Sequence, residues 1–168
     1  MTATILPVNV VPVTLTKREM AMGAECGVMR NIAAMTDNRR DAHGLTDEEG
    51  GWNFHIEGAC GEIASAKVMG RFWSPTVNTF DAADIGEHIQ VRTRSRHDFE
   101  LYVRPTDNPG HLFVLVTGKA PNFIVRGYLH GAAARCDDWL AAHGGRPPAW
   151  FVPHVALMSI EHLRLKRL

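Results

Sequence analysis

Residues 112–117 read LFVLVT, five apolar side chains in succession followed by a threonine. A short continuous run of this kind, rich in branched side chains, is typical of a strand that is buried on both faces in the middle of a sheet. The strong turn sequence PTDNPG (residues 105–110) precedes it, and a further strand is predicted over residues 122–129, NFIVRGYL. The sequence therefore centres the fold on a sheet.

More elements are predicted on both sides of this centre. Residues 88–93 and 99–104 flank the polar stretch RSRHD and are predicted to pair as a hairpin. Towards the C-terminus we expect a short helix over about residues 131–142 and an extended WFVP piece from residue 150. A second short helix is predicted near residues 159–165.

The N-terminal part is predicted to be an extended segment followed by a helix. Two prolines exclude a helix interior over residues 5–13. Thr16 and Glu19 then form a capping box, and the helix that it starts is expected to continue to about Asn38. Its predicted apolar stripe repeats at three- and four-residue steps and consists of Met22, Cys26, Met29 and Ala33.

A second helix is predicted over residues 53–69, with Gly70 as the glycine that ends it. Its interior, GACGEIASAK, is rich in small residues and lets another element pack closely on that face. The polar, glycine-rich residues 37–51 are predicted to be an exposed loop between the two helices. Helices followed by strands predict one α/β (α+β) domain over residues 1–168, with a central mixed sheet flanked by helices.

Composition and charge limit the possible functions. The 168 residues include 18 Lys and Arg against 18 Asp and Glu, so no global basic excess argues for nucleic acid. A local basic face would nevertheless be enough to bind DNA. Residues 1–84 hold 7 basic and 11 acidic side chains, whereas residues 85–168 hold 11 basic and 7 acidic ones. The acidic half either brings metal-binding carboxylates to a phosphate-binding surface or simply pairs with the basic half.

The cysteines and the apolar segments indicate the compartment. Cys26, Cys60 and Cys136 are widely spaced and form no CxxC pair, which gives no support to a disulfide framework or a cysteine zinc site. The apolar start has no basic region before it and is a poor signal peptide. No apolar run approaches the ~18–20 residues of a membrane span. We therefore expect a soluble cytoplasmic protein with no membrane contact.

Four polar residues form the candidate site. Glu62 lies in the second predicted helix, and Asp84 precedes a strand on which Gln90 and Arg92, two residues apart, share one face. Carboxylates with a nearby polar and a basic side chain can hold Mg²⁺ and stabilise charge that develops at phosphorus. The alternative is that Glu62 is an ordinary surface charge and Asp84 merely begins a turn.

An arginine row and an aromatic pair are further candidates. Arg92, Arg94 and Arg96 alternate, so they share a strand face that either tracks phosphates or is a solvated edge that discourages aggregation. Trp73 next to Phe72 either packs in the core or stacks on a base.

The segments GACGEIASAKVMG (residues 58–70) and DAADIGEHIQVRTRS (residues 81–95) resemble the PD-(D/E)XK nuclease superfamily, and more closely its small phage-type members. The resemblance implies a restriction-endonuclease-like core over residues 54–142. An N-terminal segment and helix (residues 1–38) and a C-terminal extension (residues 143–168) would complete the domain.

The resemblance also implies a function and a set of residues. A phage-type enzyme of this kind would hydrolyse phosphodiester bonds in DNA, in preference to RNA, with Mg²⁺ or Mn²⁺ and often as a homodimer. It assigns the metal to Glu62, Asp84 and Gln90, and catalysis to these three with Arg92. Nucleic acid would contact Arg92, Arg94, Arg96 and Lys67. Because Gln90 is uncharged and Arg92 is a poor general base, the alternative is a catalytically inactive nuclease-fold module that binds nucleic acid or a host protein.

Overall fold

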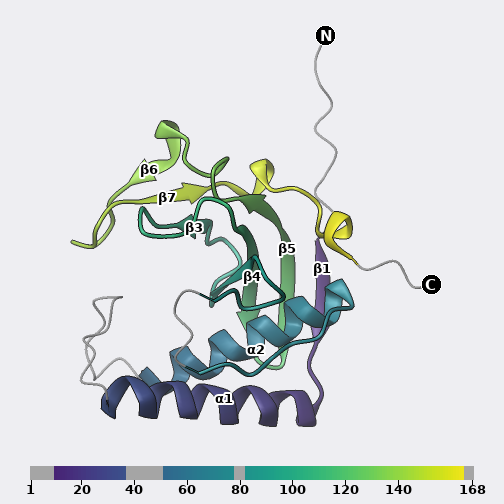
Figure 1. Ribbon diagram of the computed structural model, residues 1–168. Helices are drawn as coiled ribbons and strands as arrows, with labels where there is room; N and C mark the ends of the chain where they lie inside the picture. The colour runs from purple at the N-terminus through teal and green to yellow at the C-terminus, as the bar shows by residue number, and fades with distance from the viewer. Residues whose placement is uncertain (1–9, 37–50, 78–81, 165–168) are drawn as a thin grey trace.

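The computed structural model of the chain (Figure 1) describes residues 10–36, 51–77 and 82–164. Of the two helices, α2 (Gly51–Met69) lies against one face of a four-stranded sheet, and α1 (Lys17–Thr36) packs on α2. A smaller sheet packs on the opposite face of that sheet. The predicted α/β class is confirmed. No helix among the described residues is long and apolar enough to cross a membrane.

The main sheet is mixed, as predicted, and has the strand order β1-β5-β4-β2. Its strands are β1 (Val11–Thr14), β5 (Asn122–His130), β4 (Leu112–Lys119) and β2 (Ile89–Arg94). β2 runs parallel to β4, and the other neighbours are antiparallel. The apolar run that decided the fold is β4, and its first seven residues are buried. The smaller sheet, in the order β3-β7-β6, consists of Leu101–Val103, Ala149–Val152 and Leu140–Ala141.

Alternate residues of the main sheet face two separate apolar clusters. Val114 and Val116 of β4 pack with the two helices, whereas Phe113 and Leu115 pack with β3 and β7 of the smaller sheet. The face covered by the helices is called the helix face below, and the opposite one the far face. Since side chains alternate along a strand, this division also decides on which face each polar residue of β2 lies.

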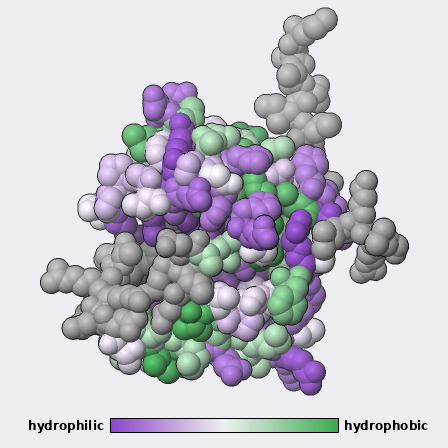
Figure 2. Space-filling model, viewed as in Figure 1, coloured by the Kyte–Doolittle hydropathy of each residue, from purple (hydrophilic) through white to green (hydrophobic). Residues whose placement is uncertain are grey.

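Glycines, rather than the predicted apolar stripe, join α1 to α2. The buried residues of α1 are Gly23, Cys26, Gly27 and Asn31. A Cβ atom on Gly27 would lie 2.5 Å from the backbone of Ile56 in α2, so the helices touch backbone to backbone. The prediction that Met22 and Met29 are buried is wrong, because they are 45% and 48% exposed. Figure 2 shows hydrophobic residues along this helix layer, at the bottom of the view.

Long-range pairing replaces the predicted hairpin. β2 pairs with β4, and β3 pairs with β7, so the strands predicted over residues 88–93 and 99–104 belong to different sheets. The polar stretch between them therefore carries the chain from one layer to the other. The hairpin prediction is wrong because each strand finds a larger apolar surface elsewhere.

Of the two short helices predicted towards the C-terminus, the first is wrong and the second is present as a 3-10 helix. Residues 131–142 form turns, a 3-10 turn (Asp137–Trp139) and the short β6, because the chain must return over the far face to reach β7. The helix predicted near residues 159–165 is the 3-10 helix Ile160–Leu163, and another 3-10 turn, His154–Ala156, precedes it. The extended WFVP piece is confirmed as β7. Of the predicted N-terminal segment, residues 1–9 lie outside the described part, as do residues 37–50 of the predicted loop.

Candidate functional site

Glu62 is a buried, fully engaged carboxylate, only 5% exposed. Arg30 of α1 donates two hydrogen bonds to it, from Nη1 to Oε1 at 2.6 Å and from Nη2 to Oε2 at 2.9 Å. Trp73 donates a third from its indole Nε1 to Oε2, at 2.9 Å. The close glycine contact between the helices brings Arg30 within reach of α2. Glu62 is therefore not a solvated surface charge, and Trp73, 7% exposed, is not placed to stack on a base.

Asp84 lies along the free edge of β2. The backbone pairs Ile85 with Ile89 in a tight turn, and beyond it the Asp84 carboxylate accepts a hydrogen bond from the Val91 N–H at 2.7 Å. Burial and the negative charge of Glu62 raise the pKa of Asp84 to about 7, although the Val91 N–H, Arg92 and Arg30 act in the opposite direction. The two predicted carboxylates are thus electrostatic neighbours.

Gln90 and Arg92 project from the far face, away from Glu62. The register pairs them with Phe113 and Leu115 of β4, which belong to the far-face cluster. Gln90 donates from Nε2 to the Ala82 carbonyl at 3.1 Å, which holds the segment before Asp84 against β2. The sequence correctly predicts that Gln90 and Arg92 share a face. It gives no sign that the face is opposite to the helix that carries Glu62.

Arg92 is held in place by contacts on the far face. Its Nη2 lies 2.9 Å from Asp107 Oδ2 in an ion pair with little exposure. Its guanidinium carbon lies 5.3 Å from the centre of the Tyr102 ring and 5.0 Å from that of Phe113. Asp107 belongs to the sequence predicted to be a turn, so its role as the partner of Arg92 is missed by sequence reasoning.

The residues implied as metal ligands do not fit a Mg²⁺ or Mn²⁺ site as they stand. Both oxygens of Glu62 accept hydrogen bonds from Arg30, and Gln90 lies on the other face of the sheet. In residues 10–36, 51–77 and 82–164, no group of three or more His, Cys, Asp or Glu side chains is arranged to hold a metal ion. Arg30 is a further residue that sequence reasoning missed, and its only sequence signal is a basic side chain one turn after Cys26 of the predicted stripe.

The other predicted arginines form a ladder with aromatic rings. The guanidinium carbon of Arg94 lies 4.5 Å from the centre of the Phe99 ring and 5.1 Å from that of Tyr102. Arg96 lies over Phe99 at 5.0 Å and pairs with Asp98. The row is therefore neither a bare phosphate track nor a simply solvated edge. Arg104, which the sequence does not single out, lies 5.3 Å from the Tyr102 ring.

Lys67 does not join this group. Its Nζ donates to the Thr14 carbonyl at 3.1 Å and to Glu19 Oε2 at 2.9 Å, and it lies on the helix layer. The structure thus separates Lys67 from the arginines with which it was predicted to bind nucleic acid.

Comparison with known protein families, with curated proteins and with solved structures finds no match to this chain. The resemblance to the PD-(D/E)XK superfamily therefore stays a prediction that rests on the quoted segments.

Proposed function

We propose that this protein binds DNA through the arginines of the far face, and that binding rather than cleavage is its activity. The observation that carries the proposal is the environment of Arg94. Its burial and the nearby positive charge of Arg146 lower the pKa of Arg94, while Tyr102 and Glu100 act in the opposite direction. Among the described residues, neither arginine forms an ion pair with a carboxylate. A DNA phosphate between them would relieve this repulsion.

The contacts of Arg94 also suit phosphate recognition. Within the described residues, one hydrogen bond of the Arg94 side chain, from Nη1 to the Glu100 carbonyl at 3.3 Å, leaves most of its N–H groups available to a ligand. Stacking on Phe99 and Tyr102 fixes the plane of the guanidinium. A fixed plane presents the two parallel N–H groups that bind phosphate in a bidentate manner, and less side-chain entropy is lost on binding.

Salt-dependent DNA binding tests this proposal. Fluorescence anisotropy with a labelled duplex would compare the wild type with the double variant Arg94→Gln/Arg146→Gln and with Arg18→Gln, which changes an exposed arginine on α1. We expect the double variant to bind at least about tenfold more weakly, and the slope of log K against log salt to fall by about two. The control should bind as the wild type does. The proposal would be overturned if the double variant bound DNA as tightly as Arg18→Gln does, or if the wild type did not bind DNA.

Metal-dependent DNA cleavage is the second candidate, and the closeness of Glu62 and Asp84 favours it. Two neighbouring carboxylates, one with its pKa raised to about 7, are a common feature of functional sites. The test is cleavage of linear, single-stranded and branched DNA with Mg²⁺ or Mn²⁺. Cleavage by the wild type that is lost in both Glu62→Gln and Asp84→Asn would replace the first proposal with this one.

A further inference from the structure

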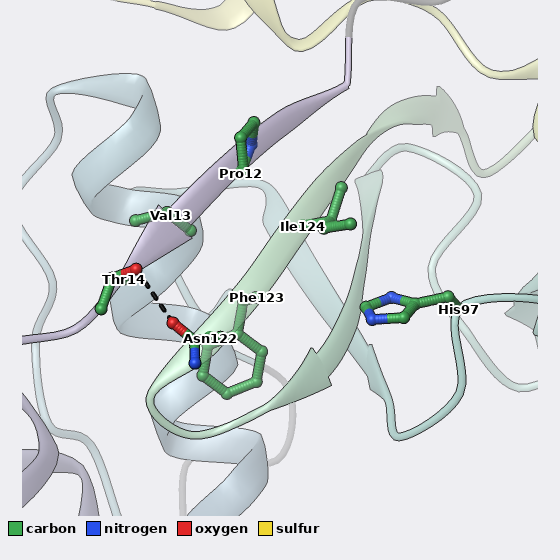
Figure 3. Close-up of a pocket in the computed structure, with 7 residues that line it drawn as sticks. All are labelled: Pro12, Val13, Thr14, His97, Asn122, Phe123 and Ile124. Atoms are coloured by element: carbon green, nitrogen blue, oxygen red, sulfur yellow. Dashed lines mark hydrogen bonds between the residues drawn. The ribbon is translucent and has the colours of Figure 1, made fainter.

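Part of the far face is left uncovered by the smaller sheet. The smaller sheet packs over Phe113, Leu115 and Leu129. Beyond it, one row of residues crosses all four strands in direct register and consists of Arg94, Thr117, Ile124 and Pro12. This row lies beside a pocket of about 190 Å³ (Figure 3).

The pocket has an apolar side and an aromatic side. Ile124 and Pro12 lie on neighbouring strands, and His97, from the segment after β2, extends its ring toward Ile124 (Figure 3). At the rim, Thr14 Oγ1 donates to Asn122 Oδ1 at 3.0 Å. This bond orients the Asn122 amide and leaves its N–H groups available as donors.

A buried threonine connects His97 to a cation. Thr117 is fully buried, and its Oγ1 accepts a hydrogen bond from Arg126 Nε at 2.8 Å. The same hydroxyl lies 3.0 Å from His97 Nδ1 and has one hydrogen to donate to it. In the part of the chain that the structure describes, Arg126 pairs with no carboxylate, and burial lowers its pKa.

We propose that this pocket holds one unpaired base of a nucleic-acid strand, with the adjoining phosphate on Arg126; the inference rests on the DNA binding proposed above. A volume of about 190 Å³ is below the ~300 Å³ of pockets that enclose a whole small ligand, so it has room for no more than one ring of a larger molecule. A ring between His97 and Ile124 would stack on an aromatic face. Since paired bases cannot enter such a pocket, the occupant is single-stranded.

The test compares single-stranded and duplex DNA. Anisotropy with an oligo-dT of about 12 nucleotides and with a duplex would be measured for the wild type, His97→Ala, His97→Phe and a control, His88→Ala, which changes an exposed histidine before β2. Loss of one stacked base is expected to weaken single-strand binding of His97→Ala by about five- to one-hundredfold. Duplex binding should stay unchanged, and His97→Phe, which keeps a stacking ring, should retain most of the affinity.

A stacking readout separates this role from a structural one. A strand with a single 2-aminopurine loses fluorescence when that base stacks, so quenching by the wild type but not by His97→Ala is expected. Equal loss of single-strand and duplex binding in His97→Ala, or unchanged binding of both, would overturn the inference while leaving DNA binding in place. Failure of the wild type to bind either DNA would overturn both proposals.

Discussion

At the residue scale, the pair of Arg30 and Glu62 is a buried ion pair that joins the two helices. Its two short hydrogen bonds join α1 to α2, and neither side chain is more than 18% exposed. Removing one member of such an ion pair strongly destabilises the fold, because the remaining charge stays buried without a partner.

Arg30→Ala is therefore expected to lower the free energy of unfolding by about 3 kcal/mol or more. The matched control is Arg164→Ala, which removes an exposed arginine paired with Glu161 and should cost about 0.5 kcal/mol or less. Urea denaturation at neutral pH measures both. The double variant Arg30→Met/Glu62→Leu should lose less stability than Arg30→Ala. A larger loss in the double variant would contradict this account of Glu62.

Asp84 predicts a pH dependence of stability. Its pKa is raised from 3.8 to about 7 in the folded protein by burial and by the charge of Glu62. The folded state therefore holds this proton more tightly than the unfolded chain does, and the resulting stability is complete below pH 3.8 and is lost as the pH rises through 7. In Asp84→Asn, an amide oxygen can still accept the Val91 hydrogen bond while the titration disappears.

We expect Asp84→Asn to be more stable than the wild type at pH 8, by about 2–4 kcal/mol at most, and the difference to shrink toward pH 4. Denaturation curves collected across this pH range check the prediction. If the free energy of unfolding changed with pH in the same way in both proteins, the pKa of Asp84 would not be raised in the folded state.

At the element scale, the sequence signals at the ends of the helices predict the structure well, whereas the pattern of apolar residues does not predict which residues of α1 contact α2. The capping box is confirmed, since the Thr16 N–H donates to Glu19 Oε2 at 2.6 Å and the Glu19 N–H donates to Thr16 Oγ1 at 3.2 Å. Gly70 ends α2 with a φ of 66°, as its position predicts. Both signals involve residues that are close in sequence. The stripe on α1 is wrong because glycines, which have no apolar side chain to count, make the contact with α2.

Alanine substitutions at two glycines test this contact, because they should change the free energy of unfolding in opposite directions. Gly27→Ala adds a methyl group 2.5 Å from the backbone of Ile56 and should destabilise the protein by about 2 kcal/mol or more, despite the better helix propensity of alanine. Gly58→Ala is the control, because its Cβ would meet no described atom within 4 Å. That variant should be up to about 1 kcal/mol more stable than the wild type. Thermal or urea unfolding measures the stability of both variants. A Gly27→Ala variant that is as stable as the wild type would argue against the close helix contact.

At the scale of the whole molecule, the sequence predicts the fold class and the sharing of faces, but not which faces meet. Gln90 and Arg92 share a face because strand geometry is local, whereas their separation from Glu62 depends on the layer in which α2 lies. The sequence likewise shows that the first half of the chain is acidic and the second half basic, but not which charges pair. Every ion pair among the described residues joins two members of the same half of the chain. The acidic and basic halves therefore do not neutralise each other through these pairs.

The hydrogen bonds along the outer side of β2 also bear on how this protein behaves in a crowded solution. A sheet with an open edge can add a strand from another molecule and so start aggregation. Here the Asp84 carboxylate and the turn at residues 85–89 occupy that edge of β2. The opposite edge strand, β1, is four residues long and contains Pro12, which has no N–H to donate. These features hinder the addition of a strand at both margins of the main sheet.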